Sequence, residues 1–269
     1  MKTNKTEVVI FDIEASCDDK NINPYYNMET IEIGAVKVKD GEITDTFQTF
    51  IEPEYVDTLT PFCTKLTGIT MDDLRGAPIF NKAILEFYSF IYGLPIYSCG
   101  EFDRKFLTRE LREKGNKYSH KLAMNAIESS HKNLKIHFDN ITGKGMKEMV
   151  KMARILNIEL TGTHHRALDD SINLAKIYIK LESIRENRLK EEFNGSKLEN
   201  LVNNINQIHK RRFNVKEGSK IQSDMKNEMF NLVHFLDSWR NVIIIDHDER
   251  KLRYISDKDL NTIKRFTKY

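Results

Sequence analysis

The chain has few of the residues that hold secreted and membrane proteins together. Its three cysteines, Cys17, Cys63 and Cys99, show no paired C-x-x-C spacing, which argues against a disulfide framework or a zinc site. No apolar run approaches the roughly 20 residues of a membrane span. The polar segment MKTNKTE leads directly into the first apolar run, so we expect no signal peptide. These absences favour a soluble, cytoplasmic protein with reduced thiols and no membrane contact.

A strong net charge is also absent, but the balance conceals an asymmetry. The 269 residues carry a formal charge of +2. Residues 1–186 hold 25 Lys and Arg against 28 Asp and Glu, whereas residues 187–269 hold 17 against 12. An acidic first part suits metal ligands, and a basic second part suits a polyanionic substrate. The alternative interpretation is that a modest lysine excess only keeps the second part soluble.

Three short segments place acidic side chains at a strand end or at the start of a helix. In VVIFDIEAS, Asp12 and Glu14 follow an apolar run and share one face of the predicted strand, because side chains alternate along a strand. In YSCGEFDRKFL, Asp103 follows a second predicted strand. In THHRALDDSINLA, His165 precedes Asp170 by five residues, at the start of an amphipathic helix. Such positions are where an α/β sheet gathers catalytic groups.

Taken together, these side chains predict phosphodiester hydrolysis. Four carboxylates suffice to bind two hard divalent cations, which can clamp the attacking and leaving oxygens of a phosphodiester. A nearby histidine can accept the proton that water loses when it attacks. Each segment alone has a simpler interpretation: a solvated strand end, a helix N-terminal charge or a chance spacing. The combination in workable contexts favours the chemistry.

At these residues the chain resembles the DEDDh, or DnaQ-like, family of 3′–5′ exonucleases. The resemblance covers roughly residues 6–183. It is greatest to the branch that holds the histone-mRNA 3′-end exonuclease, the enhanced-RNAi nuclease and the sporulation inhibitor KapD. That branch has segments similar to FDIEASC, which ends at Cys17, to the stretch 62–70 (FCTKLTGIT) and to HRALDDSINLA.

The resemblance implies an α/β, ribonuclease H-like fold, with a mixed sheet flanked by helices. It implies that Asp12, Glu14, Asp103 and Asp170 hold two Mg²⁺ or Mn²⁺ ions and that His165 is the general base. Asp12 is expected to serve both ions, with Glu14 and Asp170 completing one of the two sites. The neighbours His164 and Asp169 fall outside the family register.

The implied activity is removal of nucleoside 5′-monophosphates from the 3′ end of a nucleic acid, with RNA favoured. A DNA-trimming exonuclease is the nearest alternative. A catalytically silent nucleic-acid-binding adaptor is a further one, although such a protein usually loses a ligand or the histidine. The resemblance also implies substrate contacts at Phe102, Ala15, Ser16 and Leu66. For Phe102, a place in the core is the alternative.

The periodicities predict the order of the elements. We expect a strand at 7–13 and a hairpin of strands 31–39 and 43–51 that turns at Asp40-Gly41. Segment 117–142 has no clear pattern, and we expect its histidines, His120, His131 and His137, to be solvated. The remaining expected elements are helices at 62–66, 80–92, 102–114 and 145–156, a strand at 95–98, and the helix that Asp170 opens.

Residues 1–185 are predicted to form the exonuclease domain, and residues 186–269 a basic, mostly helical extension of unknown role. The extension shows helical patterns at 197–213 and 223–239, a short hairpin across 242–255 and a final helix. The cluster Lys210–Arg212 suits phosphate, but a basic helix end is the simpler interpretation. We expect the extension to aid substrate capture, or to bind a protein partner or a second copy of the chain.

Overall fold

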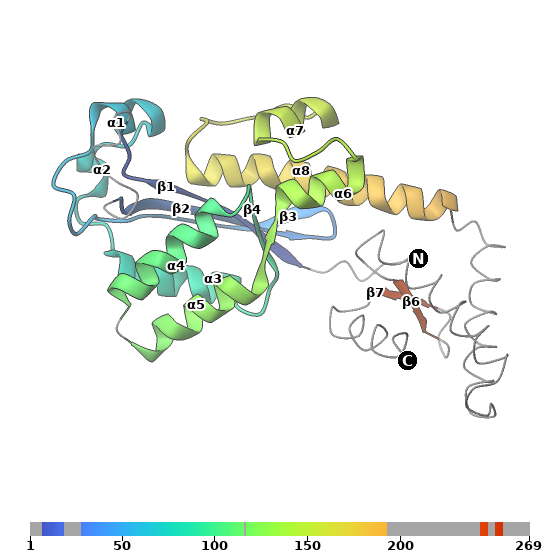
Figure 1. Ribbon diagram of the computed structural model, residues 1–269, viewed down its shortest axis with the longest axis horizontal. Helices are drawn as coiled ribbons and strands as arrows, with labels where there is room; N and C mark the ends of the chain where they lie inside the picture. Colours follow the sequence, from blue (N-terminus) through green and yellow to red (C-terminus); the bar gives the residue numbers. More distant parts are fainter. Residues whose placement is uncertain (1–6, 19–27, 116, 193–242, 247–250, 255–269) are drawn as a thin grey trace. The chain divides into compact units, whose positions relative to one another are not determined.

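The computed structural model describes residues 7–18, 28–115, 117–192, 243–246 and 251–254 (Figure 1). The chain divides into two compact units. One is Lys5–Ser183, and the other combines Met1–Asn4 with Ile184–Tyr269. Among the described residues, no helix has both the length and the apolar character that crossing a membrane requires.

A five-stranded mixed sheet forms the centre of the larger unit. The strand order is β3-β2-β1-β4-β5. The β1–β2 and β2–β3 pairs are antiparallel, whereas the β1–β4 and β4–β5 pairs are parallel. This confirms the predicted ribonuclease H-like mixed sheet. The strands are β1 (Val8–Ala15), β2 (Thr30–Lys39), β3 (Glu42–Phe50), β4 (Ile96–Ser98) and β5 (His131–Asn133).

The predicted hairpin joins β2 to β3. Asp40 and Gly41 have φ angles of 53° and 85°, as a two-residue turn of the I′ type requires. Asp and Gly adopt this left-handed backbone at low cost, so the turn and the strand register agree. The expected strand at 7–13 is confirmed and continues to Ala15.

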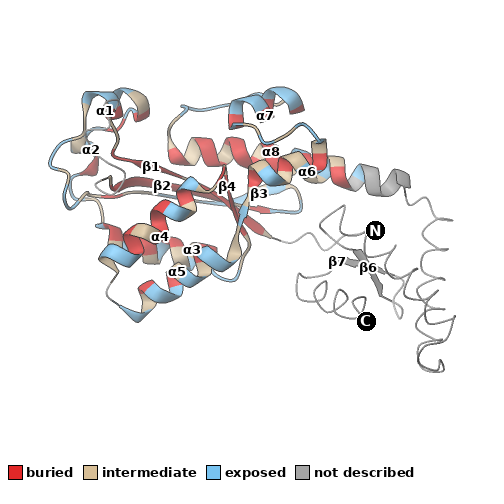
Figure 2. Ribbon diagram, in the orientation of Figure 1, coloured by how far each residue is buried: buried red, intermediate tan, exposed pale blue. Residues whose placement is uncertain are grey.

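Alternation along β1 gives the sheet two different faces. Val9, Phe11, Ile13 and Ala15 join a core with α3 (Phe80–Ile91), α4 (Phe102–Lys114) and α5 (Tyr118–Ser130). In Figure 1 these three helices lie on one side of the strands, and α6, α7 and α8 lie on the other. Figure 2 shows strands β1 and β2 almost wholly buried between the two helical layers. Asp12 and Glu14 point away from the core of α3, α4 and α5.

The second layer consists of α6 (Leu134–Thr142), α7 (Met149–Leu156) and α8 (Ala167–Glu192). The Tyr97 ring of β4 contacts both His137 of α6 and Tyr178 of α8, with ring centroids 5.7 and 5.0 Å apart. The apolar face predicted for α8 is buried at Leu174, Ala175, Ile177, Tyr178 and Leu181.

Local signals set the ends of α1 (Pro61–Thr67). The Thr60 hydroxyl accepts a hydrogen bond from the Cys63 amide at 3.0 Å, Pro61 occupies the first turn, and Gly68 ends the helix with a φ of 71°. The expected helices at 62–66, 80–92 and 102–114 are confirmed. The short helix α2 (Met71–Leu74) was not expected.

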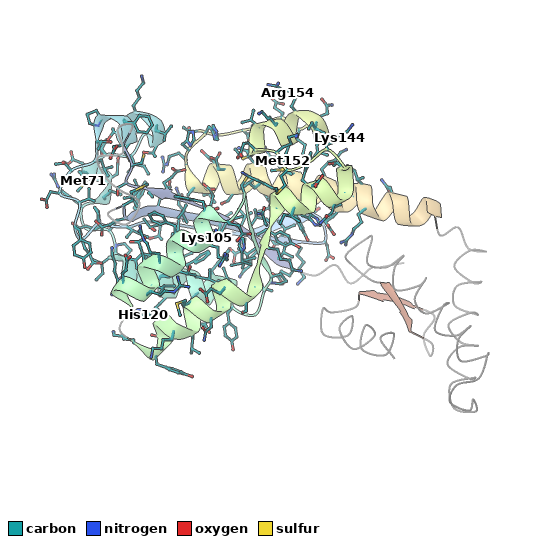
Figure 3. The ribbon with its side chains drawn as sticks, in the orientation of Figure 1. Met71, Lys105, His120, Lys144, Met152 and Arg154 are labelled. Carbon is teal, nitrogen blue, oxygen red and sulfur yellow. The ribbon has the colours of Figure 1, made fainter. Side chains whose placement is uncertain are left out.

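The prediction for the histidines of segment 117–142 was wrong. This segment forms α5, β5 and α6, and the exposed fraction of His120 is 3% and that of the His131 side chain is also 3%. His120, labelled in Figure 3, contacts the Asn81 carbonyl at 3.1 Å. His137 pairs with Glu182 at 2.9 Å. The His120 and His131 side chains are buried, and the His137 side chain is 12% exposed. Each imidazole has a polar partner 33–45 residues away along the chain, which leaves no local sequence pattern.

The helix expected at 145–156 begins later, at Met149. Met146 lies before it with an exposed fraction of 61%, whereas Met149 and Met152 are buried. Two of these three methionines are thus core residues.

In the smaller unit, β6 (Ile243–Asp246) and β7 (Lys251–Tyr254) pair antiparallel. This confirms the hairpin predicted across 242–255. The helices predicted at 197–213, at 223–239 and after Ser256 lie outside the described residues.

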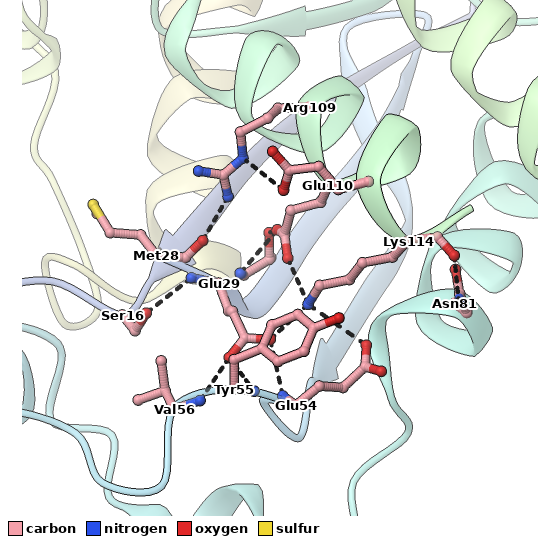
Figure 4. Close-up of polar contacts among 12 residues, drawn as sticks. Ser16, Met28, Glu29, Glu54, Tyr55, Val56, Asn81, Arg109, Glu110 and Lys114 are labelled. Carbon is pink, nitrogen blue, oxygen red and sulfur yellow. Dashed lines mark hydrogen bonds and ion pairs between the residues drawn. The ribbon is translucent and has the colours of Figure 1, made fainter. Parts of the chain in front are cut away.

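A buried charge network fixes the far end of α4 to the start of β2 (Figure 4). Lys114 Nζ lies 2.6 Å from Glu29 Oε1 and 3.1 Å from Glu110 Oε1, and the three side chains are at most 5% exposed. Glu29 also accepts hydrogen bonds from the backbone amides of Glu54, Tyr55 and Val56 at 2.8–2.9 Å. The ammonium group therefore compensates two carboxylates that have lost their contact with water.

Replacing Lys114 with methionine should destabilise the protein strongly. The substitution keeps most of the volume but leaves Glu29 and Glu110 buried without a cation, which typically costs roughly 3–5 kcal/mol. Lys105, labelled in Figure 3, is exposed on the same helix, so Lys105→Met is the matched control and should change the free energy of unfolding by less than about 0.5 kcal/mol. Urea unfolding of both variants measures the difference. Equal midpoints would show that the network does not stabilise the fold.

Candidate active site

Strand β1 contributes two of the predicted carboxylates. Asp12 pairs across the ladder with Gly34, and Glu14 pairs with Glu32. Because side chains alternate, Asp12, Glu14, Glu32 and Gly34 belong to the same face of the sheet. Glu14 is buried, with an exposed fraction of 7%, and Asp12 is partly buried. This face is the one that α8 covers.

The first turn of α8 reaches the sheet at Gly34. A Cβ atom at this position would lie 2.1 Å from the Leu168 amide nitrogen and 2.2 Å from the Ala167 carbonyl carbon, so only glycine fits. The Ser171 hydroxyl donates a hydrogen bond to the Gly34 carbonyl at 2.9 Å. This close approach brings Asp170 next to Asp12.

Glu32 holds the segment that precedes α8. Its carboxylate is fully buried and accepts hydrogen bonds from Arg166 Nη2 at 3.0 Å, Arg166 Nε at 3.1 Å and the Ala167 amide at 3.1 Å. Gln48 of β3 donates a fourth, at 2.6 Å. Sequence reasoning missed both Glu32 and Arg166, which lie far apart in the chain. An isolated glycine inside a strand does signal a close backbone approach, so Gly34 was detectable.

Asp103 enters from the first turn of α4. Its carboxylate accepts hydrogen bonds from the Ile13 amide of β1 and from the Ser98 side chain. The Ser98 hydroxyl in turn contacts Nε2 of the buried His131 at 3.0 Å. Asp103 is therefore oriented between the two parallel strands β1 and β4. Ser98 and His131 are orienting residues that the sequence did not indicate.

The four predicted carboxylates thus converge at one end of β1. Oxygen atoms of Asp12, Glu14 and Asp170 all lie within 4.8 Å of one another. Asp103 is close enough for its charge to raise the pKa of both Asp12 and Glu14. An all-oxygen donor set of this kind fits hard divalent cations such as Mg²⁺ or Mn²⁺.

Burial and mutual repulsion raise the pKa values of this cluster. Burial, and then the charges of Asp103, Glu14 and Asp170, hold the pKa of Asp12 well above its usual value. Burial and the charges of Asp170 and Glu32 raise the pKa of Glu14 to about 8. Burial raises the pKa of Asp103 to about 6 against several hydrogen bonds that lower it. Neighbouring carboxylates repel one another when ionised, so a bound cation suits the cluster.

Two histidines border the cluster. His165 has a left-handed backbone with a φ of 65°, and its amide donates a hydrogen bond to Asp170 Oδ2 at 3.2 Å. Burial, together with the neighbouring charge of His164, lowers the pKa of His165. His164 was not predicted to belong to the site, yet its Nδ1 atom is 2.9 Å from Asp170 Oδ2. Asp169 turns away and accepts a hydrogen bond from the Thr163 amide at 2.8 Å.

The four residues predicted to contact substrate have different surroundings. Phe102 has an exposed fraction of 46%, so it does not belong to the core. Ser16 is buried, and its hydroxyl accepts a hydrogen bond from the Glu29 amide at 2.9 Å. Ala15 is buried at the end of β1, and Leu66 is half-buried on α1. Of the four, Phe102 offers the most accessible side chain.

The raised pKa of Glu14 predicts that the metal-free protein becomes less stable as the pH rises. The ordinary value is 4.5 and the folded value is about 8, so the folded chain holds more protons than the unfolded chain between these values. The contribution of Glu14 to stability is complete below pH 4.5 and is lost as the pH rises through 8. Cations bind the ionised carboxylates, so Mg²⁺ should raise the Tm more at pH 8 than at pH 5.

Thermal unfolding in chelator or in Mg²⁺, at several pH values, checks this expectation. Glu14→Gln is the control, because an amide does not titrate and should flatten the pH dependence of the metal-free Tm. A metal-free Tm that rises between pH 5 and pH 8 would contradict the raised pKa values.

Comparison with known proteins agrees with the geometry. The sequence profile of the exonuclease family RNase T matches residues 9–178, more than half of the chain. A PolC-type DNA polymerase III from Caldanaerobacter subterraneus is 32% identical over 185 residues, which are 67% of this chain and 12% of that protein. Human 3′-5′ exoribonuclease 1 is 27% identical over 205 residues, which are 71% of this chain and 57% of that protein. The chain therefore spans less than two-thirds of either relative.

Among solved structures, the nuclease domain of 3'hExo, a DEDDh family member bound to rAMP, is similar with a TM-score of 0.60 and 26% identity. The match covers 68% of this chain and 94% of that domain. The resemblance to DEDDh exonucleases is therefore confirmed, and the chain belongs to the RNase T exonuclease family.

Proposed function

We propose that the protein is a 3′–5′ exonuclease that acts on RNA and releases nucleoside 5′-monophosphates. The observation that carries the proposal is the convergence of Asp12, Glu14, Asp103 and Asp170 at one end of β1, with His165 beside them. Such a set of carboxylates suits two divalent cations, Mg²⁺ or Mn²⁺.

The carboxylates would hold the cations, and the surrounding hydrogen bonds would fix their orientation. Bound cations supply charge stabilisation to the attacking and leaving oxygens of the phosphodiester and make water easier to deprotonate. Glu32 and Gly34 set the position of Asp170, while Ser98 and the Ile13 amide set that of Asp103. Oriented ligands of this kind reduce the rearrangement needed during the reaction.

His165 is the proposed general base. Its lowered pKa favours the neutral imidazole near pH 7, and only this form can accept a proton from the attacking water. The hydrogen bond from its amide to Asp170 keeps it next to the carboxylates. Phe102 is proposed to stack on the terminal base, because its ring is exposed at the start of the helix that carries Asp103.

The preference for RNA rests on similarity to nucleases that act on RNA. Exoribonuclease 1 is a relative, and a similar structure, with a TM-score of 0.57 and 26% identity, shows a 3′-exonuclease recognising a histone mRNA stem-loop. The alternative is a DNA-trimming exonuclease, which the 32% identity to a DNA polymerase III favours.

The C-terminal extension stays a prediction. Most of residues 186–269, including Lys210–Arg212, lie outside the described residues, so its proposed part in substrate capture rests on charge alone.

Paired substitutions of adjacent residues test the catalytic assignment. Asp170→Asn should reduce turnover by orders of magnitude because a ligand charge is lost, whereas Asp169→Asn should keep most of the activity. His165→Ala should cost ~10²–10⁴-fold, the usual contribution of general-base catalysis, and His164→Ala should cost little. Single-turnover rates on a 5′-labelled strand measure all four. If His164 proved essential and His165 dispensable, the general base would have been assigned one residue too late in the segment THHRALDDSINLA.

Matched RNA and DNA strands of identical sequence test the substrate. In Mg²⁺, the RNA should shorten from its 3′ end faster than the DNA, and chelator should stop both reactions. Discrimination between them requires contacts to the 2′-hydroxyl. Faster loss of DNA would favour the alternative function, and cleavage of a circular strand would exclude an exonuclease.

A further inference from the structure

His164 brings a nitrogen donor to the carboxylate cluster, and the proposed reaction has no use for this donor. Its Nδ1 atom lies 3.0 Å from Asp170 Oδ1 and 2.9 Å from Oδ2. The imidazoles of His164 and His165 stack with ring centroids 4.0 Å apart and planes inclined by 22°. Ligand atoms of His164, His165 and Asp170 all lie within 4.8 Å of one another. Asp170 is thus shared between a carboxylate triad and a second triad that contains two imidazoles.

The backbone explains why two consecutive side chains meet. In an extended segment, neighbouring side chains point to opposite sides. The left-handed φ of 65° at His165 breaks this alternation, and the hydrogen bond from its amide to Asp170 Oδ2 holds the bend against α8. The pair is therefore positioned by the same turn that positions the predicted metal ligand.

The two triads favour different cations. The oxygen-only triad of Asp12, Glu14 and Asp170 suits Mg²⁺, which binds imidazole poorly. Two imidazoles and one carboxylate suit Zn²⁺ and its neighbours in the first transition series. Bonds of 2.0–2.2 Å in a tetrahedral site place ligand atoms roughly 3.3–3.6 Å apart. His164 Nδ1 lies 2.9 Å from Asp170 Oδ2, and no two donor atoms of the triad are more than 4.8 Å apart, so modest rotations of the rings would bring the donors to that spacing.

We propose that His164, His165 and Asp170 form a binding site for a transition-metal ion of the Zn²⁺ class, and that its occupation inhibits the Mg²⁺-dependent reaction. The binding part stands on the geometry alone, whereas the inhibition rests on the proposed function. Occupation draws Asp170 away from the carboxylate triad and ties up the ring nitrogen with which His165 would accept a proton.

His164 makes the site separable from the reaction. Its imidazole has an exposed fraction of 51%, and it is the one member of the second triad to which we assign no role in hydrolysis. Replacing it with alanine removes one of the two imidazole ligands without disturbing the core. His137 provides a matched control, because it too forms a histidine–carboxylate pair, with Glu182 at 2.9 Å, but it belongs to none of the candidate metal groups found among the described residues.

Cobalt titration of the full chain tests the binding. Four-coordinate Co²⁺ replaces Zn²⁺ with similar geometry and absorbs visible light, so it reports directly on the ligands. The wild-type chain and His137→Gln should develop this absorption at one equivalent, and Zn²⁺ should abolish it, whereas His164→Ala and His164→Gln should not develop it. Thermal unfolding confirms that each variant is folded. The same absorption in the two His164 variants would overturn the site.

Inhibition is measured separately, at saturating Mg²⁺ and buffered free Zn²⁺. Removing a residue that only hydrogen-bonds to a metal ligand typically weakens metal binding 10–100-fold. Removing His164, which would bind the metal directly, should therefore raise the half-inhibitory Zn²⁺ concentration by at least about tenfold. An unchanged concentration would overturn the inhibitory role. A wild-type chain that binds Co²⁺ but degrades neither RNA nor DNA in Mg²⁺ would refute the proposed function and leave the metal site intact.

Discussion

The contact between the first turn of α8 and the backbone of β2 decides the geometry of the site. No side chain fits at Gly34, because a Cβ there would overlap the Ala167–Leu168 peptide, and the buried Glu32 carboxylate binds both the side chain of Arg166 and the amide of Ala167. Asp170 reaches Asp12 only because the helix lies this close to the strand. The other three carboxylates, Asp12, Glu14 and Asp103, are attached to β1 or hydrogen-bonded to it, so the approach of α8 completes the cluster.

Two groups of buried charges in the same unit illustrate opposite solutions to desolvation. Burial alone would raise the pKa of Glu29, but the hydrogen bonds from Lys114 and from backbone amides hold it below its usual value. At Asp12 and Glu14, burial and neighbouring carboxylates act in the same direction and raise the pKa values. The first group contains its own cation, Lys114. The second has no cation of its own, so its mutual repulsion would be relieved by the divalent ions that the proposed nuclease reaction uses.

In the segment THHRALDDSINLA, one turn both leads the chain into α8 and positions two histidines. The left-handed backbone at His165 lets the chain bend into α8 while both imidazoles stay beside Asp170. Only His165 was predicted to belong to the site, but the turn brings both histidines to the same carboxylate. A single short segment thereby carries a predicted metal ligand, the proposed base and a second nitrogen donor.

The sequence by itself determined the elements with local causes and the identity of the four carboxylates. The Asp40-Gly41 turn and the cap at Thr60 follow from neighbouring residues, and each carboxylate stands at a strand end or in a first helical turn. Tertiary structure alone decided the burial of His120 and His131 and the pairing of His137 with Glu182. It also decided the support from Glu32 and Ser98 and the contact of His164 with Asp170. The physical reason is distance along the chain and orientation in space: the partners of the buried groups lie up to 135 residues apart, and one left-handed residue redirected the imidazoles.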